Sequence, residues 1–527
     1  MDLILRGGTV YDGTGSPPIQ TDIAIKNYRI AAIGHDLTGS EIIDISGLSV
    51  APGFIDTHCH SEFTLLADPR AEGKVIQGIT TEINGNCGMS GGPLMGAALK
   101  QRESDLLSYG ITERWESLGE FLHILEARGL VINYATLVGH GNIKASVMGY
   151  EDRKPTEPEM NLMRELLAAA LHDGAIGLST GLIYPPGIYS DTEELIELAR
   201  YGNQVVPGFV YTSHMRSEGD YLLDAVQETL RIGRESGALV HISHIKTSGK
   251  ENWHKIDACI DLMEEAIKEG IKVSCDRYPY TAGSTDLDAV FPKWMFEGGN
   301  NAELKRLNDE RTLARLREEL PQAPELWDTI IIASVDTAPN KWMEGLSVTE
   351  VGSRLNIHPI EACFSVLRDE SLRVGAIFHS MSEENLVRFL SLPYAMMGSD
   401  SSVRGFDGPT VQGKPHPRGF GSIPRYFRLH GHGKNPLTDS VVPLEKLIHK
   451  LTGLPAEIFS LRDRGVIKEG AIADLVVFSP EDVFDNASYQ EPFLRTDGIE
   501  YVLVNGKVVL SEGKTTSLRP GCVIRGN

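Results

Sequence analysis

The stretch GFIDTHCHSE, from Gly53 to Glu62, combines a short apolar run with an aspartate and two histidines. The run before Asp56 predicts a short buried strand, and His58 and His60 follow at its end. Because side chains alternate along an extended chain, two residues separated by one other point to the same side. The stretch therefore predicts a pair of imidazoles that project together from the end of a strand.

Outward from this stretch, short apolar segments alternate with longer amphipathic segments. The alternation can be followed through VINYATLVGHGN, EMNLMRELLAAALHDG, AIGLSTGL, TEELIELARYGNQ, GFVYTSHMR, DAVQETLRIGRESG, ALVHISHIK, CIDLMEEAIKEG and KVSCDRYPY. Repetition of strand and helix predicts a parallel sheet. We expect an α/β fold in which residues 51–454 form a closed (β/α)8 TIM-like barrel, with an open doubly wound sheet as the alternative.

Both ends of the chain have a different composition. LILRGGTVYDG and DIAIKNYRIAAIG near the start, and ADLVVFSPEDV and IEYVLVNGKVVLSEGK near the end, read as strands separated by glycine turns. Within the last of these, VNGKVV predicts a tight hairpin. We expect residues 1–50 and 455–527 to build one small composite β-sandwich domain. The charged helical stretch AELKRLNDERTLARLREEL interrupts the central alternation and predicts an inserted subdomain at about 284–340.

Composition narrows the class of protein. The chain has 527 residues, of which 41% are hydrophobic and 23% charged, as in globular proteins. A formal charge of -22 argues against nucleic acid or an anionic membrane as a partner, but a local cationic pocket could still bind a small anionic substrate. The opening MDLILRGGTVYDG lacks a signal-peptide core, and no apolar run is long enough to span a membrane. The six cysteines have no regular spacing, so we expect reduced thiols in a cytoplasmic protein.

Side chains that can bind metal follow the predicted strands. They are His58, His60, Cys87, His214 and His244, together with the carboxylate of Asp400. In a (β/α) barrel the carboxyl ends of the strands converge on one face, which carries the active site. Imidazole, thiolate and carboxylate are typical ligands of zinc. The pattern therefore predicts a metal site at this face.

Each residue taken singly has a simpler interpretation. A lone strand-end histidine is more often hydrogen-bonded in the core or at the surface, and a lone cysteine is usually a small buried residue. His241 lies three residues before His244 and should face away from it, which favours a structural role. His140 fits either interpretation, and Asp56 could orient a ligand or pack at the rim of the barrel. The metal interpretation depends on the coincidence of the whole set at strand ends.

The motif GFIDTHCH resembles the metal-binding His-x-His motif of the amidohydrolase superfamily. Further blocks, NGNCG, TSHMR, HISHIK, DRYPYTAGST, GSD and PHPR, in this order, are similar to the N-acyl-D-amino-acid deacylases, or D-aminoacylases. The resemblance extends over nearly the whole chain. It implies zinc-dependent hydrolysis of the amide bond of an N-acyl-D-amino acid, which releases a carboxylate and a free D-amino acid. The preference for the D form comes from the resemblance alone.

The resemblance also implies roles for the candidate residues. Cys87, His214 and His244 would hold one tightly bound zinc ion, and His58 and His60 would share Cys87 in a second, weaker metal position. Many members of the superfamily bridge two metals with a carboxylated lysine, and no equivalent lysine signal is found in this chain. Zinc would polarise the scissile carbonyl and acidify water, with Cys87 held as the thiolate.

Proton transfer and substrate binding are likewise assigned by resemblance. Asp400 would be the general acid and base. The substrate carboxylate would bind Lys246, Tyr278, Ser284 and Arg418, and Tyr184 would donate a hydrogen bond to the amide oxygen. Two features depart from the family pattern. Ile245 replaces a second histidine found in some members, and SVRGFDGPTVQGK lengthens the segment between Asp400 and Arg418.

Two rival functions remain open on the sequence. The first is a cyclic amidase of the hydantoinase or dihydropyrimidinase type, which the missing lysine bridge and the presence of Cys87 disfavour. The second is a non-catalytic scaffold, which would be expected to lose metal ligands. We expect a small-molecule substrate as the partner. The preferred side chain and acyl group, the number of metals and the oligomeric state are not determined, although Arg404, Lys293 and Lys414 could contact an acidic side chain.

Overall fold

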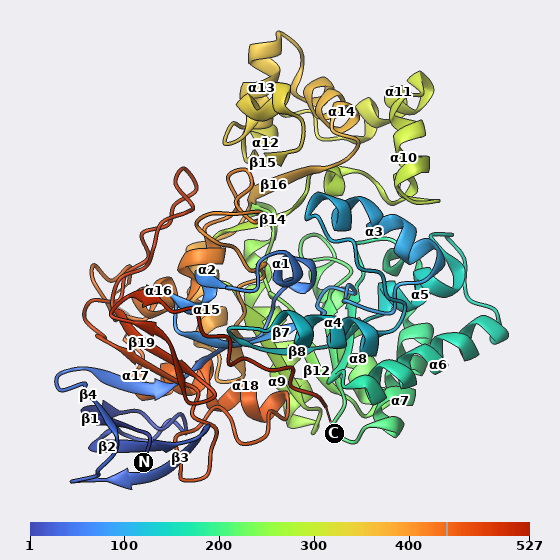
Figure 1. Cartoon of the computed structure of the whole chain (residues 1–527). Helices are drawn as coiled ribbons and strands as arrows, with labels where there is room; N and C mark the ends of the chain where they lie inside the picture. Colours follow the sequence, from blue (N-terminus) through green and yellow to red (C-terminus); the bar gives the residue numbers. More distant parts are fainter. Residues whose placement is uncertain (439–440, 527) are drawn as a thin grey trace.

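The structure is a computed structural model that describes residues 1–438 and 441–526 (Figure 1). Its central part is built from parallel strands with helices around them. The strands run in the orders β17-β13-β12-β11-β10-β9 and β6-β7-β8, all in parallel pairs. They are β6 (Phe54–Asp56), β7 (Ile79–Asn84), β8 (Asn133–Thr136), β9 (Val138–Gly139), β10 (Gly177–Gly181), β11 (Val210–His214), β12 (Leu239–Ile242), β13 (Val273–Arg277) and β17 (Ala395–Met397).

Hydrogen bonds join the two groups of parallel strands at both of their edges. On one side, the Leu137 amide between β8 and β9 donates to the Asn84 carbonyl of β7 at 2.8 Å. On the other, the Thr57 amide after β6 donates to the Met397 carbonyl of β17 at 3.4 Å. This second junction, between the first and the last parallel strand, carries several of the candidate residues.

The helices that surround these strands alternate with them along the chain, as predicted from the sequence. They are α1 (Glu62–Ala67), α2 (Glu72–Val75), α3 (Gly96–Ser108), α4 (Leu118–Arg128), α5 (His140–Met148), α6 (Glu157–Asp173), α7 (Thr192–Val205), α8 (Leu222–Ser236), α9 (Ile256–Lys268), α15 (Glu383–Ser391), α16 (Arg418–Leu429), α17 (Leu444–Leu451) and α18 (Gly453–Ile458), with the 3-10 turns η1 (Gly187–Tyr189) and η2 (Lys250–Lys255). Local sequence defines their starts. Ser117 and Glu120, for example, form a reciprocal capping box at the start of α4. Along α8, Leu222, Val226 and Leu230 are buried at helical spacing, so the helix packs on the strands through one face.

A separate lobe with its own core lies between β13 and β17, and Figure 1 shows it above the parallel strands. It contains the antiparallel sheet β14-β16-β15 and five helices of the described chain. The elements are β14 (Ala282–Asp286), η3 (Leu287–Val290), η4 (Lys293–Met295), α10 (Asn300–Leu307), α11 (Glu310–Glu319), α12 (Pro324–Asp328), β15 (Ile330–Val335), η5 (Ala338–Met343), α13 (Val348–Leu355), α14 (Pro359–Asp369) and β16 (Val374–His379). The lobe therefore extends beyond the 284–340 segment expected from the sequence, because β16 must return to pair with β14.

The two ends of the chain share one sheet, in the order β21-β20-β19-β18-β5-β1-β2-β3, with β4 also paired to β1. Its strands are β1 (Leu3–Val10), β2 (Ile19–Lys26), β3 (Arg29–Gly34), β4 (Glu41–Asp44), β5 (Ser49–Pro52), β18 (Leu475–Phe478), β19 (Ile499–Val504), β20 (Lys507–Ser511) and β21 (Lys514–Thr515). The hairpin predicted from VNGKVV is confirmed: Val504 pairs with Lys507 across a turn in which Asn505 and Gly506 have positive φ.

Two further expectations concern the described residues. All six cysteines are free thiols in this structure. Within the described ranges, no helix is long and apolar enough to cross a membrane.

Candidate metal centre

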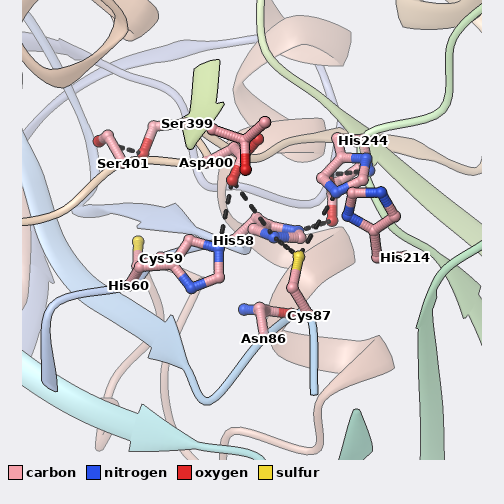
Figure 2. Close-up of polar contacts among 12 residues, drawn as sticks. His58, Cys59, His60, Asn86, Cys87, His214, His244, Ser399, Asp400 and Ser401 are labelled. Atoms are coloured by element: carbon pink, nitrogen blue, oxygen red, sulfur yellow. Dashed lines mark hydrogen bonds and ion pairs between the residues drawn. The ribbon is translucent and has the colours of Figure 1, made fainter. Parts of the chain in front are cut away.

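The six candidate residues of the metal site lie at or just beyond the carboxyl ends of parallel strands, and in Figure 2 their side chains face one another. His58 and His60 follow β6, Cys87 follows β7, His214 ends β11, His244 follows β12, and Asp400 follows β17. Segments more than 300 residues apart in the chain are thus brought to one place, because parallel strands all end on the same face.

The Cys87 sulfur lies near the middle of this group. Its Sγ is 3.3 Å from His58 Nε2 and 3.5 Å from His244 Nε2. Asp400 Oδ1 is 3.7 Å from His58 Nε2. One donor atom from each of these four residues lies within 4.8 Å of the others. This spacing suits donors that converge on a single cation.

His60 and His214 complete the group from opposite sides. His60 Nε2 is 3.2 Å from Asp400 Oδ1, and the His214 ring lies 4.4 Å from the His244 ring, centre to centre. Both ring nitrogens of His214 are buried and have no hydrogen-bond partner in the described structure. Buried polar atoms are nearly always hydrogen-bonded. An imidazole with no hydrogen bond, whose nearest acid is Glu218 at 3.9 Å, therefore fits a metal ligand beside a thiol and a second imidazole. The donor set of imidazole, thiolate and carboxylate fits zinc.

The backbone is strained at three of the six positions. Cys87, His244 and Asp400 have φ values of 53°, 35° and 52°, in the left-handed region that residues other than glycine seldom adopt. Each such residue costs of order 1–3 kcal/mol, so the surrounding structure must stabilise the conformation. Backbone strain at three residues whose side chains lie close together is typical of a functional site.

The imidazoles favour an ionised sulfur. Burial by itself would raise the pKa of the Cys87 thiol, but the adjacent His58 and His244 hold that pKa well below its ordinary value. For His244, burial and the charge of the nearby Lys246 would both lower the pKa. Glu218 and Cys87 outweigh both effects and raise the pKa of His244 to about 9. The group is therefore arranged to carry a thiolate, the form of cysteine that binds metal.

Asp400 lies between the imidazoles and an arginine. Arg418 Nη1 is 2.9 Å from Asp400 Oδ2, while the other carboxylate oxygen faces His60 and His58. Burial would raise the pKa of Asp400, but the charge of Arg418 and the hydrogen bond from His60 hold it well below its usual range. Asp400 is therefore ionised and can accept a proton at Oδ1.

Two carboxylates that orient the imidazoles were missed by the sequence analysis. Asp276 accepts hydrogen bonds from His58 Nδ1 at 3.1 Å and from the His244 amide at 2.7 Å. Glu218 contacts His244 Nδ1 at 2.8 Å and also pairs with Lys246. Carboxylates in this position fix the orientation of a ligand imidazole. The sequence contained one signal for each of them. Asp276 is a charged residue near the end of a predicted buried strand, and Glu218 is an acid four residues after His214.

The residues expected to bind the substrate carboxylate gather around one tyrosine ring. The guanidinium of Arg418 lies 4.6 Å from the centre of the Tyr278 ring, and Lys246 Nζ lies 5.8 Å from it. Arg418 also donates to the Ser284 carbonyl at 3.2 Å. The Tyr184 ring lies 5.0 Å from the His214 ring, and its hydroxyl lies 3.0 Å from Thr285 Oγ1, next to Ser284 in β14. Two cations thus lie next to Asp400 and His244, where an anionic substrate could be held.

The other residues considered in the sequence analysis lie outside this group. His241 contacts Asp276 at 2.7 Å and Ser274 at 2.8 Å, which agrees with a structural role. His140 contacts Glu194 at 2.9 Å. Asp56 contacts a buried lysine, which is described below. Three cations were suggested as contacts for an acidic side chain of the substrate. Lys293 forms an ion pair with Asp152, and Arg404 donates a hydrogen bond to the Thr410 carbonyl. Lys414 lies next to Gly345.

A small cavity of about 30 Å³ adjoins the centre. Cys87, Tyr184 and Arg102 line it, together with the backbone of Gly141 and Gly181.

Comparison with known proteins was made for the sequence and for the fold. A model of the amidohydrolase family matches residues 41–313 and 419–510. D-aminoacylase from Alcaligenes xylosoxydans xylosoxydans is 36% identical over 525 residues, covering 99% of this chain and 97% of the relative. The crystal structure of N-acyl-D-glutamate deacylase from Bordetella bronchiseptica, with zinc and a phosphonate mimic of the tetrahedral intermediate, is 32% identical. It matches with a TM-score of 0.83 over 100% of this chain and 99% of that one.

A structure of D-aminoacylase, concerned with its binuclear metal centre and with activation by one metal and attenuation by a second, has the same TM-score of 0.83. It is 34% identical, and 99% of each chain is covered.

Proposed function

The chain belongs to the amidohydrolase family, and from this premise we propose that it hydrolyses the amide bond of N-acyl-D-amino acids, releasing a carboxylate and a free D-amino acid. The enzyme class and the linear amide substrate follow from relatives that match over the whole chain and are deacylases of D-amino acid derivatives. The observation that carries the proposal is the convergence of Cys87, the histidines and Asp400, with the cationic side chains of Arg418 and Lys246 beside them.

For the metal, we propose that Cys87, His214 and His244 hold one zinc ion tightly, and that His58 and His60 share Cys87 in a weaker second position. The unpaired ring nitrogens of His214 and the lowered pKa of Cys87 support the first position. When bound, zinc polarises the amide carbonyl and acidifies water. Asp276 and Glu218 keep His58 and His244 in the orientation that leaves their Nε2 atoms free for a metal.

Asp400 is proposed as the proton carrier. Its Oδ1 takes a proton from the attacking water and passes it to the amide nitrogen, a role worth roughly 10²–10⁴-fold in rate. Because the carboxylate is ionised in the free protein, it is in the correct state to act first as a base. The contact of Arg418 with Oδ2 leaves Oδ1 directed at the imidazoles, which is the side from which the proton would arrive.

Arg418, Lys246, Tyr278 and Ser284 are proposed to bind the substrate carboxylate. A guanidinium can hold a carboxylate through two parallel hydrogen bonds, which aligns the amide with the metal. Tyr184 is proposed to donate a hydrogen bond to the amide oxygen, for which its hydroxyl must leave Thr285. These residues exclude water from the reacting bond and orient it relative to Asp400.

We also propose that the parallel strands close into an eight-stranded (β/α)8 barrel within residues 51–454, with β8 and β9 acting as one interrupted strand. The hydrogen bonds at both junctions support this closure. The shared sheet of residues 1–50 and 455–527 is proposed to fold as the composite β-sandwich, and the lobe between β13 and β17 as the inserted subdomain. In such a barrel the active site lies at the carboxyl ends of the strands, where the six residues are found.

A substrate panel tests the proposed function. Purified protein with measured zinc content should release acetate from N-acetyl-D-amino acids at least about a hundredfold faster than from the L forms, since each factor of ten needs only about 1.4 kcal/mol of transition-state discrimination. Equal rates for both forms would refute the assigned stereochemistry. Activity confined to hydantoin or dihydropyrimidine rings would replace the proposal with the cyclic amidase.

A further inference from the structure

A fully buried lysine contacts residues that flank His58, His60 and Asp400 in the chain. Lys74, on α2, has no exposed surface. Its Nζ lies 2.7 Å from Asp56 Oδ2, 3.0 Å from Glu82 Oε1 and 2.9 Å from Ser399 Oγ. Asp56 ends β6, Glu82 lies in β7, and Ser399 follows β17. One ammonium group therefore binds three neighbouring parallel strands at their carboxyl ends.

The lysine fills a position that would otherwise resemble a metal site. Donor atoms of Asp56, Cys59 and Glu82 lie within 4.8 Å of one another, a composition compatible with a cation. Lys74 Nζ contacts all three, including Cys59 Sγ at 3.5 Å. Cys59 lies between His58 and His60, and its side chain points to the opposite side of the chain from theirs (Figure 2). The histidines thus face the metal centre while the cysteine faces the lysine.

Hydrogen bonds connect this cluster to the backbone that carries the candidate ligands. Asp56 Oδ1 accepts from the Ser399 amide at 2.7 Å and from the His58 amide at 3.4 Å. The Asp400 amide donates to the His58 carbonyl at 2.8 Å, and the His60 amide donates to the Ser401 carbonyl at 3.2 Å. The loop of His58 to His60 and the loop of Ser399 to Ser401 are therefore bound to each other above Lys74.

We propose that Lys74 is a positioning residue: it holds the loop of Asp400 against the loop of His58 and His60, so that these side chains are in place before any metal binds. The strained φ of 52° at Asp400 needs such support. An ammonium group directs its three donors at fixed partners. Without it, the carboxylates of Asp56 and Glu82 would be buried without a counter-charge, which favours separation of the strands.

The chain contains a matched control in a second buried lysine. Lys144, on α5, also has no exposed surface, and its Nζ lies 2.8 Å from Ser190 Oγ and 2.8 Å from Glu194 Oε2. Among the residues that the structure describes, no hydrogen bond or ion pair joins Lys144, Ser190 or Glu194 to the six residues of the centre. Both clusters contain a buried lysine that contacts a serine hydroxyl and a glutamate, while Lys74 has a second carboxylate partner in Asp56. The clusters differ in the loops that they contact.

The first experiment compares Ser399→Ala with Ser190→Ala in protein stripped of metal. Each change removes one hydroxyl partner of a buried lysine and alters no charge. Hydrogen exchange, followed by mass spectrometry, should be at least about tenfold faster in Ser399→Ala for peptides that cover residues 57–61 and 398–402, because the two loops then separate more often. Ser190→Ala should leave exchange in these peptides unchanged. This measurement does not depend on the proposed function.

The second experiment compares the double variants Lys74→Met/Glu82→Gln and Lys144→Met/Glu194→Gln, each of which preserves the net charge of its cluster. On an N-acetyl-D-amino acid, the first should lower kcat by about 10–100-fold, as loss of a positioning contact typically does. Its KM should stay within about threefold, since Arg418 and Lys246 are untouched. The second should change kcat by less than about threefold, the scale of a merely structural change.

Either experiment can overturn the proposal. Unchanged exchange in Ser399→Ala, or equal acceleration in Ser190→Ala, would show that Lys74 does not hold the loops together. Equal loss of kcat in both double variants, or a rise in KM without a fall in kcat, would assign Lys74 to general stability. If the double variant of Lys74 does not fold, the exchange experiment decides alone. If no substrate is turned over by the unaltered protein, the proposed function fails while the exchange result still tests the role of Lys74.

Discussion

The candidate metal centre and the terminal sheet use buried residues in opposite ways. In the sheet, Ile25 and Val476 are fully buried, and the strands β1, β2, β5 and β18 bind each other through regular backbone pairing. At the centre, three imidazoles and a thiol are buried beside the partly exposed side chains of His60 and Asp400, and Cys87, His244 and Asp400 have strained backbones. The residues of the sheet thus stabilise the fold, whereas the centre brings reactive groups together at a cost in stability.

Metal removal should produce the largest difference between the two regions, because it should abolish activity at the centre and leave the terminal sheet folded. Dialysis against a chelator should reduce hydrolysis of N-acetyl-D-amino acids to background, because the proposed zinc ion would polarise the amide carbonyl and acidify water. The terminal sheet should stay folded, so the far-ultraviolet circular dichroism spectrum should be nearly unchanged. Addition of one equivalent of zinc should restore activity. Full activity in protein shown to be free of metal by elemental analysis would contradict the assignment.

Asp400→Asn is the next test, because it replaces the carboxylate that we propose as the proton carrier with a side chain of the same shape. We expect kcat to fall by roughly 10²–10⁴-fold. Zinc content should remain at the level of the unaltered protein, since Cys87, His214 and His244 are intact. Acetate release and elemental analysis on the same sample provide both measurements. Near-normal kcat would remove Asp400 from the acid and base role.

Arg418→Met tests the proposal that the cations beside the centre bind the substrate carboxylate. Removing a buried partner of a charge costs about 2–5 kcal/mol, so kcat/KM should fall at least about 30-fold. Arg464→Met is the matched control, because Arg464 is about as buried as Arg418 and pairs with Asp474 near the terminal sheet. The control should lower the free energy of unfolding and leave KM unchanged. A similar KM for both variants would exclude Arg418 from substrate binding.

Lys450 is a buried ionisable residue outside the centre, and its titration should affect the stability of the fold. It lies on α17 and donates to the carbonyls of Leu390 and Leu392, and burial lowers its pKa to about 8 from the ordinary 10.5. Between these two values the unfolded chain binds the proton that the folded chain has released. The free energy of unfolding should therefore rise with pH in this window, by at most about 1.4 kcal/mol per pH unit.

Urea unfolding at pH 8 and pH 10 measures this contribution. Lys450→Met lacks the titrating group, so its stability should rise less than that of the unaltered protein over the same interval. Equal pH dependence in both proteins would show that Lys450 is not deprotonated in the fold.

Ile25→Val in the terminal sheet should have the smallest effect. Loss of one buried methylene group typically costs about 0.5–1.5 kcal/mol of unfolding free energy. Because Ile25 lies in the core of the sheet and not in the centre, kcat and KM should stay within about twofold. Chemical denaturation and steady-state kinetics test the two statements. A large change in kcat would show that the two regions are energetically coupled.

Much of the architecture was accessible from the sequence because it depends on local periodicity. Alternating strands and helices, the β-rich ends and the hairpin at Asn505 and Gly506 all follow from spacing and turn chemistry. The extent of the inserted lobe did not, because β16 pairs with β14 across nearly a hundred residues and no local pattern marks that pairing.

The candidate centre shows the same division. Its six donor residues could be selected because each follows a strand, and strand ends meet in a parallel barrel. Asp276, Glu218 and Lys74 could not be selected, because a buried charge is recognised only through its partners. In the sequence, Asp276 is one polar residue within the predicted strand KVSCDRYPY, and nothing around Lys74 distinguishes it from the other lysines.

By itself, the sequence determined which residue types are present and how they are spaced, and thus the strands, the helices and the set of donors that could bind zinc. Tertiary structure alone decided which donor atoms lie within a few ångströms of Cys87 Sγ and which carboxylates orient the imidazoles. It also decided which buried lysine contacts the loops that carry these residues. The physical reason is that propensity and periodicity act over a few residues. Coordination, charge pairing and desolvation act between atoms a few ångströms apart, whatever their separation along the chain.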